Sequence, residues 1–126
     1  MARKWGQHFL KRPAVAERIL ETAGVEVGTP VWEIGPGAGI LTAALRKQGV
    51  RVLAVEIDPK LGAALRERFR GDVDFRLIEG DVLALSLEVL DEWDSGPWKV
   101  VANLPYNIST PLFFRMLAER HRWQSL

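Results

Sequence analysis

The chain has 126 residues, of which 48% are hydrophobic and 26% are charged. These values are typical of one globular domain and exclude a disordered or fibrous protein. No apolar run approaches the roughly 20 residues of a membrane-spanning helix, and no signal-peptide core follows the basic N-terminus. The absence of cysteine excludes disulfides and thiolate metal sites, and two histidines alone cannot form a zinc site. We therefore expect a cytoplasmic protein with neither a membrane nor a metal partner.

The net charge of +1 hides an uneven distribution along the chain. Residues 1–20 carry five basic residues and one acidic residue, and residues 111–126 carry three and one. Residues 71–98 carry eight acidic residues and one basic residue. Basic ends suit a polyanionic partner such as a nucleic acid, although charges that only keep the chain soluble give the same pattern.

Helical and strand-like segments alternate along the chain. In order, we predict a helix from Pro13 to Gly24, a strand over 31–34, a helix from Ile40 to Gly49, a strand over 51–55, a helix from Pro59 to Gly71, a strand over 73–78, a helix over 83–93, a strand over 98–102 and a helix from Pro111 to Leu117. Repeated strand–helix units predict an α/β fold, a parallel sheet with helices on both faces. Ligands of such sheets bind at the carboxyl ends of the strands.

A glycine-rich loop with the sequence EIGPGAG, residues 33–39, joins the first predicted strand to the next helix. Gly35, Gly37 and Gly39 permit positive φ and let a ligand approach the backbone closely. The helix N-terminus that follows offers unpaired N–H groups. Ile40 stands where the dinucleotide-binding fingerprint of dehydrogenases requires a glycine, so that fingerprint fails. The alternative is a tight turn that binds no ligand.

Carboxylates lie at the ends of the second and third predicted strands. Glu56 can accept hydrogen bonds from both hydroxyls of a ribose. Asp81 can accept one from the exocyclic amine of an adenine, with the Val82 amide nearby. The structural alternatives are a surface carboxylate for Glu56 and a helix cap for Asp81. Together with the glycine loop, these residues predict a site for a nucleoside that carries an amino-acid arm.

A segment with the sequence NLPY follows the fourth predicted strand. The Asn103 side-chain oxygen and the Leu104 carbonyl can each accept an N–H of an exocyclic amine. Pro105 makes the segment rigid, and Tyr106 can stack on a planar base. This combination favours a planar nitrogen substrate, and a turn built by Asn and Pro is the alternative.

Five segments, in this order and spacing, resemble the ribosomal RNA adenine N6,N6-dimethyltransferases. They are GQHFL at 6–10, EIGPGAGILT at 33–42, EID at 56–58, GD at 80–81 and NLPYNIST at 103–110. The resemblance spans residues 3–117 and implies the Rossmann-like class I fold of S-adenosylmethionine-dependent methyltransferases. Family members continue with further strands and a helical C-terminal domain. We therefore expect residues 1–126 to be the N-terminal part of a catalytic domain, truncated before the fifth strand.

The resemblance also implies roles for individual residues. Contacts to the cofactor, S-adenosylmethionine, are implied for His8, Leu10, Gly35, Gly37, Glu56, Asp81 and Asn103. The implied catalytic segment is Asn103, Leu104, Pro105 and Tyr106. The candidates for contacts to RNA phosphates are Lys4, Lys11, Arg12 and Arg115. The implied reaction is dimethylation of two adjacent adenosines near the 3′ end of small-subunit rRNA, on the immature small ribosomal subunit during ribosome biogenesis.

Several other functions remain open at the level of sequence. One is a nucleotide-dependent oxidoreductase, which Ile40 argues against. A second is an RNA-binding or assembly factor that keeps the fold without catalysis. A third is a related rRNA adenine methyltransferase of the erythromycin-resistance type, and a fourth is a methyltransferase that acts on protein amides or DNA.

Overall fold

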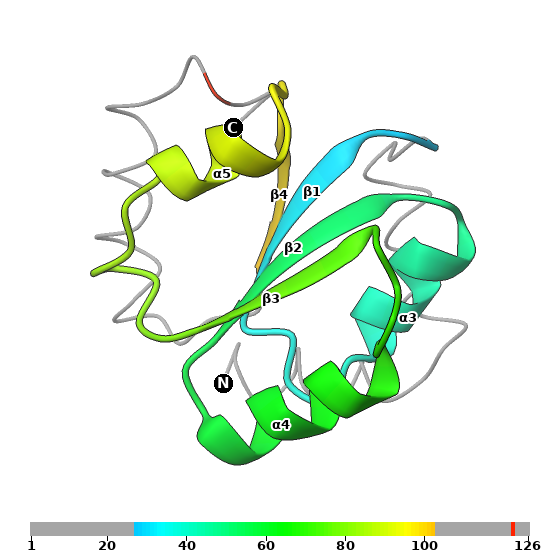
Figure 1. Ribbon diagram of the computed structural model, residues 1–126, viewed down its shortest axis with the longest axis vertical. Coiled ribbons are helices and arrows are strands. Elements are labelled where there is room, and N and C mark those ends of the chain that lie inside the picture. Colours follow the sequence, from blue (N-terminus) through cyan, green and yellow to red (C-terminus); the bar gives the residue numbers. More distant parts are fainter. Residues whose placement is uncertain (1–26, 103–121, 123–126) are drawn as a thin grey trace, which may run out of the picture.

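The structure is a computed structural model that describes residues 27–102 and residue 122, and this part of the chain forms a four-stranded parallel sheet. The strands are β1 (Pro30–Ile34), β2 (Arg51–Glu56), β3 (Phe75–Glu79) and β4 (Lys99–Ala102). Their order in the sheet is β3-β2-β1-β4 (Figure 1). The chain therefore runs outward from β1 to β3 and then crosses to the other side of β1. The predicted helices at 13–24 and 111–117 lie outside the described residues.

Helices cover both faces of this sheet, which confirms the predicted architecture. Helices α3 (Ile40–Lys47) and α4 (Pro59–Arg68) lie on one side, and α5 (Glu88–Trp93) lies on the other (Figure 1). α4 starts where the sequence predicts, because Pro59 takes its first position and the Asp58 carboxylate accepts hydrogen bonds from the amides of Lys60 and Leu61 at 2.8 and 3.3 Å.

The hydrophobic core has two layers, one on each face of the sheet. Successive side chains of a strand point to opposite faces, so Val31 and Trp32 of β1 enter different layers. The α5 layer consists of Trp32, Ile34, Leu53, Val55, Val82, Leu87, Leu90 and Trp98. The α3 layer consists of Val31, Leu41, Ala44, Leu45, Val50, Val52 and Ala54. Every residue of β1 is buried, as expected for a central strand covered on both faces.

The prediction of a helix over 83–93 is wrong for its first half, because α5 begins at Glu88. The Asp81 carboxylate accepts a hydrogen bond from the Leu83 amide at 2.9 Å, and the Ser86 hydroxyl accepts one from the Glu88 amide at 3.4 Å. Such local side-chain bonds offer the backbone an alternative to helix. Val82 and Leu87 lie in this non-helical segment, and their side chains are nevertheless buried in the core.

β3 also begins later than predicted, at Phe75 instead of Val73. The Asp72 carboxylate accepts a hydrogen bond from the Asp74 amide at 3.1 Å, and the Asp72 carbonyl accepts one from the Phe75 amide at 3.2 Å. These bonds form a turn that leaves Val73 84% exposed. The alternation of apolar and polar residues therefore begins two residues before the strand does.

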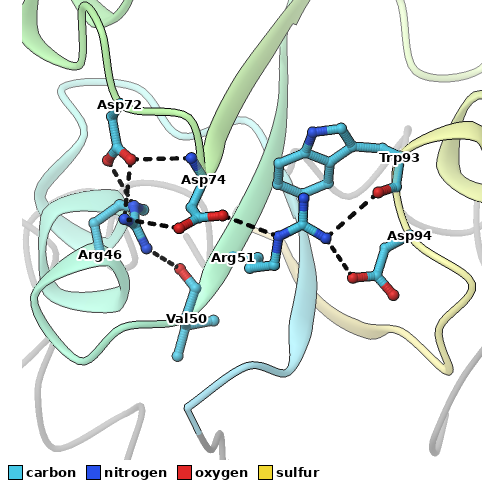
Figure 2. Close-up of polar contacts among 7 residues, drawn as sticks. All are labelled: Arg46, Val50, Arg51, Asp72, Asp74, Trp93 and Asp94. Carbon is cyan, nitrogen blue, oxygen red and sulfur yellow. Dashed lines mark hydrogen bonds and ion pairs between the residues drawn. The ribbon is translucent and has the colours of Figure 1, made fainter.

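Two arginines join neighbouring elements at the amino ends of the strands (Figure 2). Arg46 of α3 donates to both oxygens of Asp72 at 2.6 and 3.0 Å and to the Val50 carbonyl at 2.7 Å. Arg51 at the start of β2 donates to Asp74 at 3.2 Å and to Asp94 at 2.5 Å. The Arg51 guanidinium also lies 4.1 Å from the centre of the Trp93 ring (Figure 2). This network fixes the edge of the sheet opposite to the one where parallel sheets bind ligands.

Candidate functional site

The carboxyl ends of β1, β2 and β3 bring three of the predicted segments to one edge of the sheet. Ile34 pairs with Val55, and Glu56 pairs with Glu79. The Gly35 amide donates to the Val55 carbonyl at 2.9 Å, and the Gly80 amide donates to the Glu56 carbonyl at 2.9 Å. The glycine loop, Glu56 and the segment that contains Asp81 are therefore immediate neighbours, although 46 positions separate Gly35 from Asp81.

The glycine loop takes backbone conformations that favour glycine at three alternate positions. The φ angles are 71° at Gly35, 58° at Gly37 and 84° at Gly39, all in the left-handed region. A Cβ built on Gly37 would meet nothing within 4 Å, so this side of the loop is open. The loop therefore exposes backbone at the point where the sequence predicts a ligand.

Glu56 is a buried carboxylate with both oxygens already oriented by backbone amides. Oε1 accepts a hydrogen bond from the Gly37 amide at 2.9 Å, and Oε2 accepts one from the Asp58 amide at 3.1 Å. Glu56 is only 5% exposed, so it is not the surface carboxylate that the sequence left as the alternative. Each oxygen of a carboxylate can accept more than one hydrogen bond, so Glu56 keeps acceptor capacity for hydroxyl groups.

Asp81 lies just past the end of β3 and is exposed. Its Oδ1 accepts a hydrogen bond from the Leu83 amide, and its carbonyl accepts one from the Ala84 amide at 3.0 Å. The carboxylate thus closes a turn. This role is similar to the helix cap that the sequence left as the alternative, but α5 begins only at Glu88. Its second oxygen keeps acceptor capacity for an amine.

Glu33 is a buried titratable residue to which the sequence analysis assigned no role. It lies on β1 two residues before Gly35, is 2% exposed and accepts a 2.5 Å hydrogen bond from the Thr42 hydroxyl of α3. Burial raises the pKa of Glu33 to about 7, the Thr42 hydrogen bond opposes that rise, and the nearby Glu56 charge adds to it. The signal in the sequence was a carboxylate inside an otherwise apolar strand, VWEI.

Ile57 is a second residue at this edge that sequence reasoning passed over. It directly follows Glu56 and is 65% exposed, one of four large hydrophobic residues exposed within the described part of the chain. A single exposed isoleucine needs no special explanation. Its place between Glu56 and Asp58 nevertheless supplies apolar surface beside the polar groups of the site.

The remaining predicted site residues lie outside the described part of the chain. They are His8, Leu10, Asn103, Leu104, Pro105 and Tyr106, and the RNA candidates Lys4, Lys11, Arg12 and Arg115. Ala102, the last residue of β4, pairs with Ile34 of β1. β4 thus ends at the same edge as β1 and β2, and the NLPY segment follows directly from there.

Within residues 27–102 and at residue 122, no cluster of three or more His, Asp or Glu side chains has a metal-binding arrangement. No helix in the same part of the chain has both the length and the apolarity to cross a bilayer.

Known proteins resemble this chain both in sequence and in structure. A family model described as ribosomal RNA adenine dimethylase matches residues 1–125. A ribosomal RNA small subunit methyltransferase A from Geobacter sulfurreducens is 45% identical over 122 residues. The match covers 96% of this chain and 44% of the relative, so the chain spans less than half the length of that protein.

Two solved structures share the arrangement of the sheet and helices. The 23S rRNA methyltransferase ErmE superposes with a TM-score of 0.71 at 32% identity, over 86% of this chain and 42% of ErmE. The glycopeptide N-methyltransferase MtfA, in a complex with S-adenosyl-L-methionine, gives a TM-score of 0.60 at 25% identity, over 86% of this chain and 48% of MtfA. The fold is therefore the class I methyltransferase fold expected from the sequence.

Proposed function

Because the chain belongs to the ribosomal RNA adenine dimethylase family, we propose that this protein methylates adenosines of small-subunit rRNA at N6, with S-adenosylmethionine as methyl donor. The observation that carries the proposal is the edge where the open glycine loop, the oriented Glu56 carboxylate and Asp81 meet. The small-subunit relatives favour this substrate. The likeness to ErmE supports 23S rRNA as the second candidate.

The described residues fit an adenosine that carries a methionine arm. The space beside Gly37 is empty where any other residue would place its Cβ. The methionine arm can therefore pass close to the loop backbone there. Glu56 offers acceptor capacity to two ribose hydroxyls, and its oxygens are held in place before the ligand arrives. Asp81 offers an acceptor to the adenine amine, and Ile57 offers the ring an apolar contact.

Charge favours the same ligand. Glu56 ends β2 and Asp81 lies two residues past the end of β3, and no lysine or arginine within the described ranges forms an ion pair with either carboxylate. A ligand with a positively charged sulfonium and ammonium would meet a favourable potential here. When bound, S-adenosylmethionine would supply a methyl group on its sulfonium sulfur, and in-line transfer of this group to the target amine would release S-adenosylhomocysteine as the leaving group.

The NLPY segment completes the proposed mechanism. The adenine N6 lone pair is delocalised into the ring, so the amine is a weak nucleophile. We assign the Asn103 side-chain oxygen and the Leu104 carbonyl to accept the two N6–H groups. These hydrogen bonds strengthen as positive charge grows on N6, so they stabilise the transition state more than the ground state. The methylated amine is acidic and releases its proton without a strong general base.

The target adenine must leave its stack to reach this edge. Tyr106 offers a replacement stacking surface, and Pro105 holds the segment rigid. Lys4, Lys11, Arg12 and Arg115 supply positive charge for the phosphates of the surrounding RNA. The immature small ribosomal subunit is the natural partner of such a site, and a cytoplasmic location is part of the same proposal.

Two measurements test the proposed function. Calorimetric titration of the chain with S-adenosylmethionine and with NAD distinguishes a methyltransferase site from that of an oxidoreductase, and we expect binding of the first alone. Transfer of tritiated methyl groups to immature small subunits, with large subunits as the control, then identifies the RNA. Label on the large subunit instead would favour the ErmE-like reaction, and cofactor binding without transfer to either would favour a non-catalytic assembly factor.

A further inference from the structure

The tip of the glycine loop is held from two sides. From β2, Glu56 accepts the Gly37 amide at 2.9 Å. From α4, the Arg68 Nη1 donates to the Ala38 carbonyl at 3.1 Å. The two partners lie 19 and 30 residues away from the loop in sequence. The N–H and C=O groups of two successive loop residues therefore have fixed directions before any ligand binds.

α4 packs directly against the end of the same loop. A Cβ built on Gly39 would lie 2.6 Å from Cδ2 of Leu65 and 3.5 Å from Nη1 of Arg68. Leu65 is 2% exposed, so the helix is anchored at this point. Arg68 lies three residues after Leu65, at the last position of α4, and its side chain reaches the loop from this fixed base.

A loop of this kind benefits from being held. Glycine has the largest conformational freedom to lose, and Gly35, Gly37 and Gly39 all sit in the left-handed region. A ligand that had to order the loop would bind more weakly, because the entropy cost would be subtracted from its affinity. Contacts that hold the loop in the ligand-free protein remove that cost.

We propose that Arg68 is a positioning residue that acts through the Ala38 carbonyl to preform the part of the glycine loop facing the methionine arm. The inference rests on the proposed function for the identity of the ligand. Arg68 is exposed and contacts the loop on its carbonyl side, so it acts on the loop and not on the ligand. No motif in the sequence marks this arginine.

The chain offers a matched control at Arg70. It is 79% exposed, carries the same charge two residues further on, and pairs with Glu67 at 3.6 Å. Arg68→Ala and Arg70→Ala change the overall charge equally. A difference between them therefore reports the contact with the loop and not long-range electrostatics.

The first experiment needs no ligand. Hydrogen exchange of the Gly37 and Gly39 amides is compared in the 126-residue chain and in both variants, because both amides are hydrogen-bonded within the site. We expect Arg68→Ala to accelerate the exchange of these two amides by about 3- to 10-fold, because the variant loses the exposed hydrogen bond from Arg68 to the Ala38 carbonyl. Arg70→Ala leaves it unchanged. Equal exchange in all three proteins overturns the inference.

The second experiment uses two ligands that differ in the methionine arm. We expect Arg68→Ala to lower the affinity for S-adenosylhomocysteine about 3- to 10-fold and the affinity for adenosine less than about 2-fold. Arg68→Lys should partly restore the affinity for S-adenosylhomocysteine. Equal losses for both ligands would show a merely structural role and contradict the inference. Failure of the unaltered chain to bind S-adenosylhomocysteine would instead refute the proposed function, and the exchange measurement would still decide the role of Arg68.

Discussion

The Thr42 hydroxyl donates a 2.5 Å hydrogen bond to the buried carboxylate of Glu33, and this contact ties α3 to β1 directly behind the glycine loop. The carboxylate has no basic partner within the described residues, and the Glu56 charge lies nearby. Folding therefore favours the protonated form of Glu33. A residue at the base of the candidate site thus changes its charge close to neutral pH.

We predict that Glu33→Gln flattens the dependence of stability on pH. The pKa of Glu33 rises from 4.5 to about 7 on folding, so the free energy of unfolding falls as pH rises through this window. Between pH 5 and pH 8 the variant should gain about 2–3 kcal/mol relative to the parent chain. The amide keeps an acceptor for Thr42. Urea denaturation at several pH values measures the difference, and parallel curves would show that Glu33 does not titrate in this window.

The part of this site that the sequence predicts well is local in the chain. The glycine loop follows β1, Glu56 ends β2 and Asp81 lies two residues past β3, and parallel pairing then brings them to one edge. The role of Arg68 escaped prediction because it depends on a contact between distant residues. Nothing near Arg68 indicates that it reaches Ala38, 30 residues earlier.

The errors in the element boundaries have a different and local origin. Helix and strand periodicity continue through 83–87 and 73–74, but Asp81, Ser86 and Asp72 bind nearby backbone amides and form turns there. The apolar residues Val82 and Leu87 reach the core, whereas Val73 and Leu83 stay exposed. The pattern of apolar residues does not reveal where a side chain competes for the backbone.

Glu56→Ala should weaken binding of S-adenosylmethionine by about 1–3 kcal/mol, because hydrogen bonds to a charged group are lost. The Gly37 amide also loses its acceptor. Calorimetric titration measures the loss, with Glu67→Ala as the control because Glu67 is an exposed carboxylate on α4. An affinity equal to that of the parent chain would remove Glu56 from the site.

Asn103→Ala should abolish methyl transfer while the fold is kept, because the proposed role of its side-chain oxygen is to hold N6 in the transition state. Activity is measured as transfer of tritiated methyl groups to immature small subunits, by protein in which the unaltered sequence is active. Folding is measured by circular dichroism. Cofactor affinity measured in parallel separates a defect in chemistry from one in binding. Turnover within a few-fold of the parent would contradict the mechanism.

Arg46→Met should lower the free energy of unfolding by about 1–3 kcal/mol, because a bidentate charged pair with Asp72 is lost and its partner remains half-buried. Arg46 also holds the pKa of the Asp72 carboxyl below its usual value through their hydrogen bond. The stabilisation therefore disappears as pH falls through that lowered pKa. Urea denaturation at neutral and acidic pH tests both effects, with the exposed Arg70→Ala as the control. An equal loss at both pH values would contradict the coupling to Asp72.

Gly39→Ala should destabilise the chain more than Gly71→Ala, although both glycines have nearly the same φ, 84° and 80°. The backbone strain of placing alanine in the left-handed region is therefore matched between the two variants. A Cβ on Gly39 would meet Leu65 at 2.6 Å, whereas one on Gly71 would meet nothing within 4 Å. Because Leu65 is buried and has little room to move, we expect the overpacking to cost about 1–3 kcal/mol beyond the shared strain. Urea denaturation of the two variants measures this difference directly, and equal stabilities would show that α4 can withdraw from the glycine loop without cost.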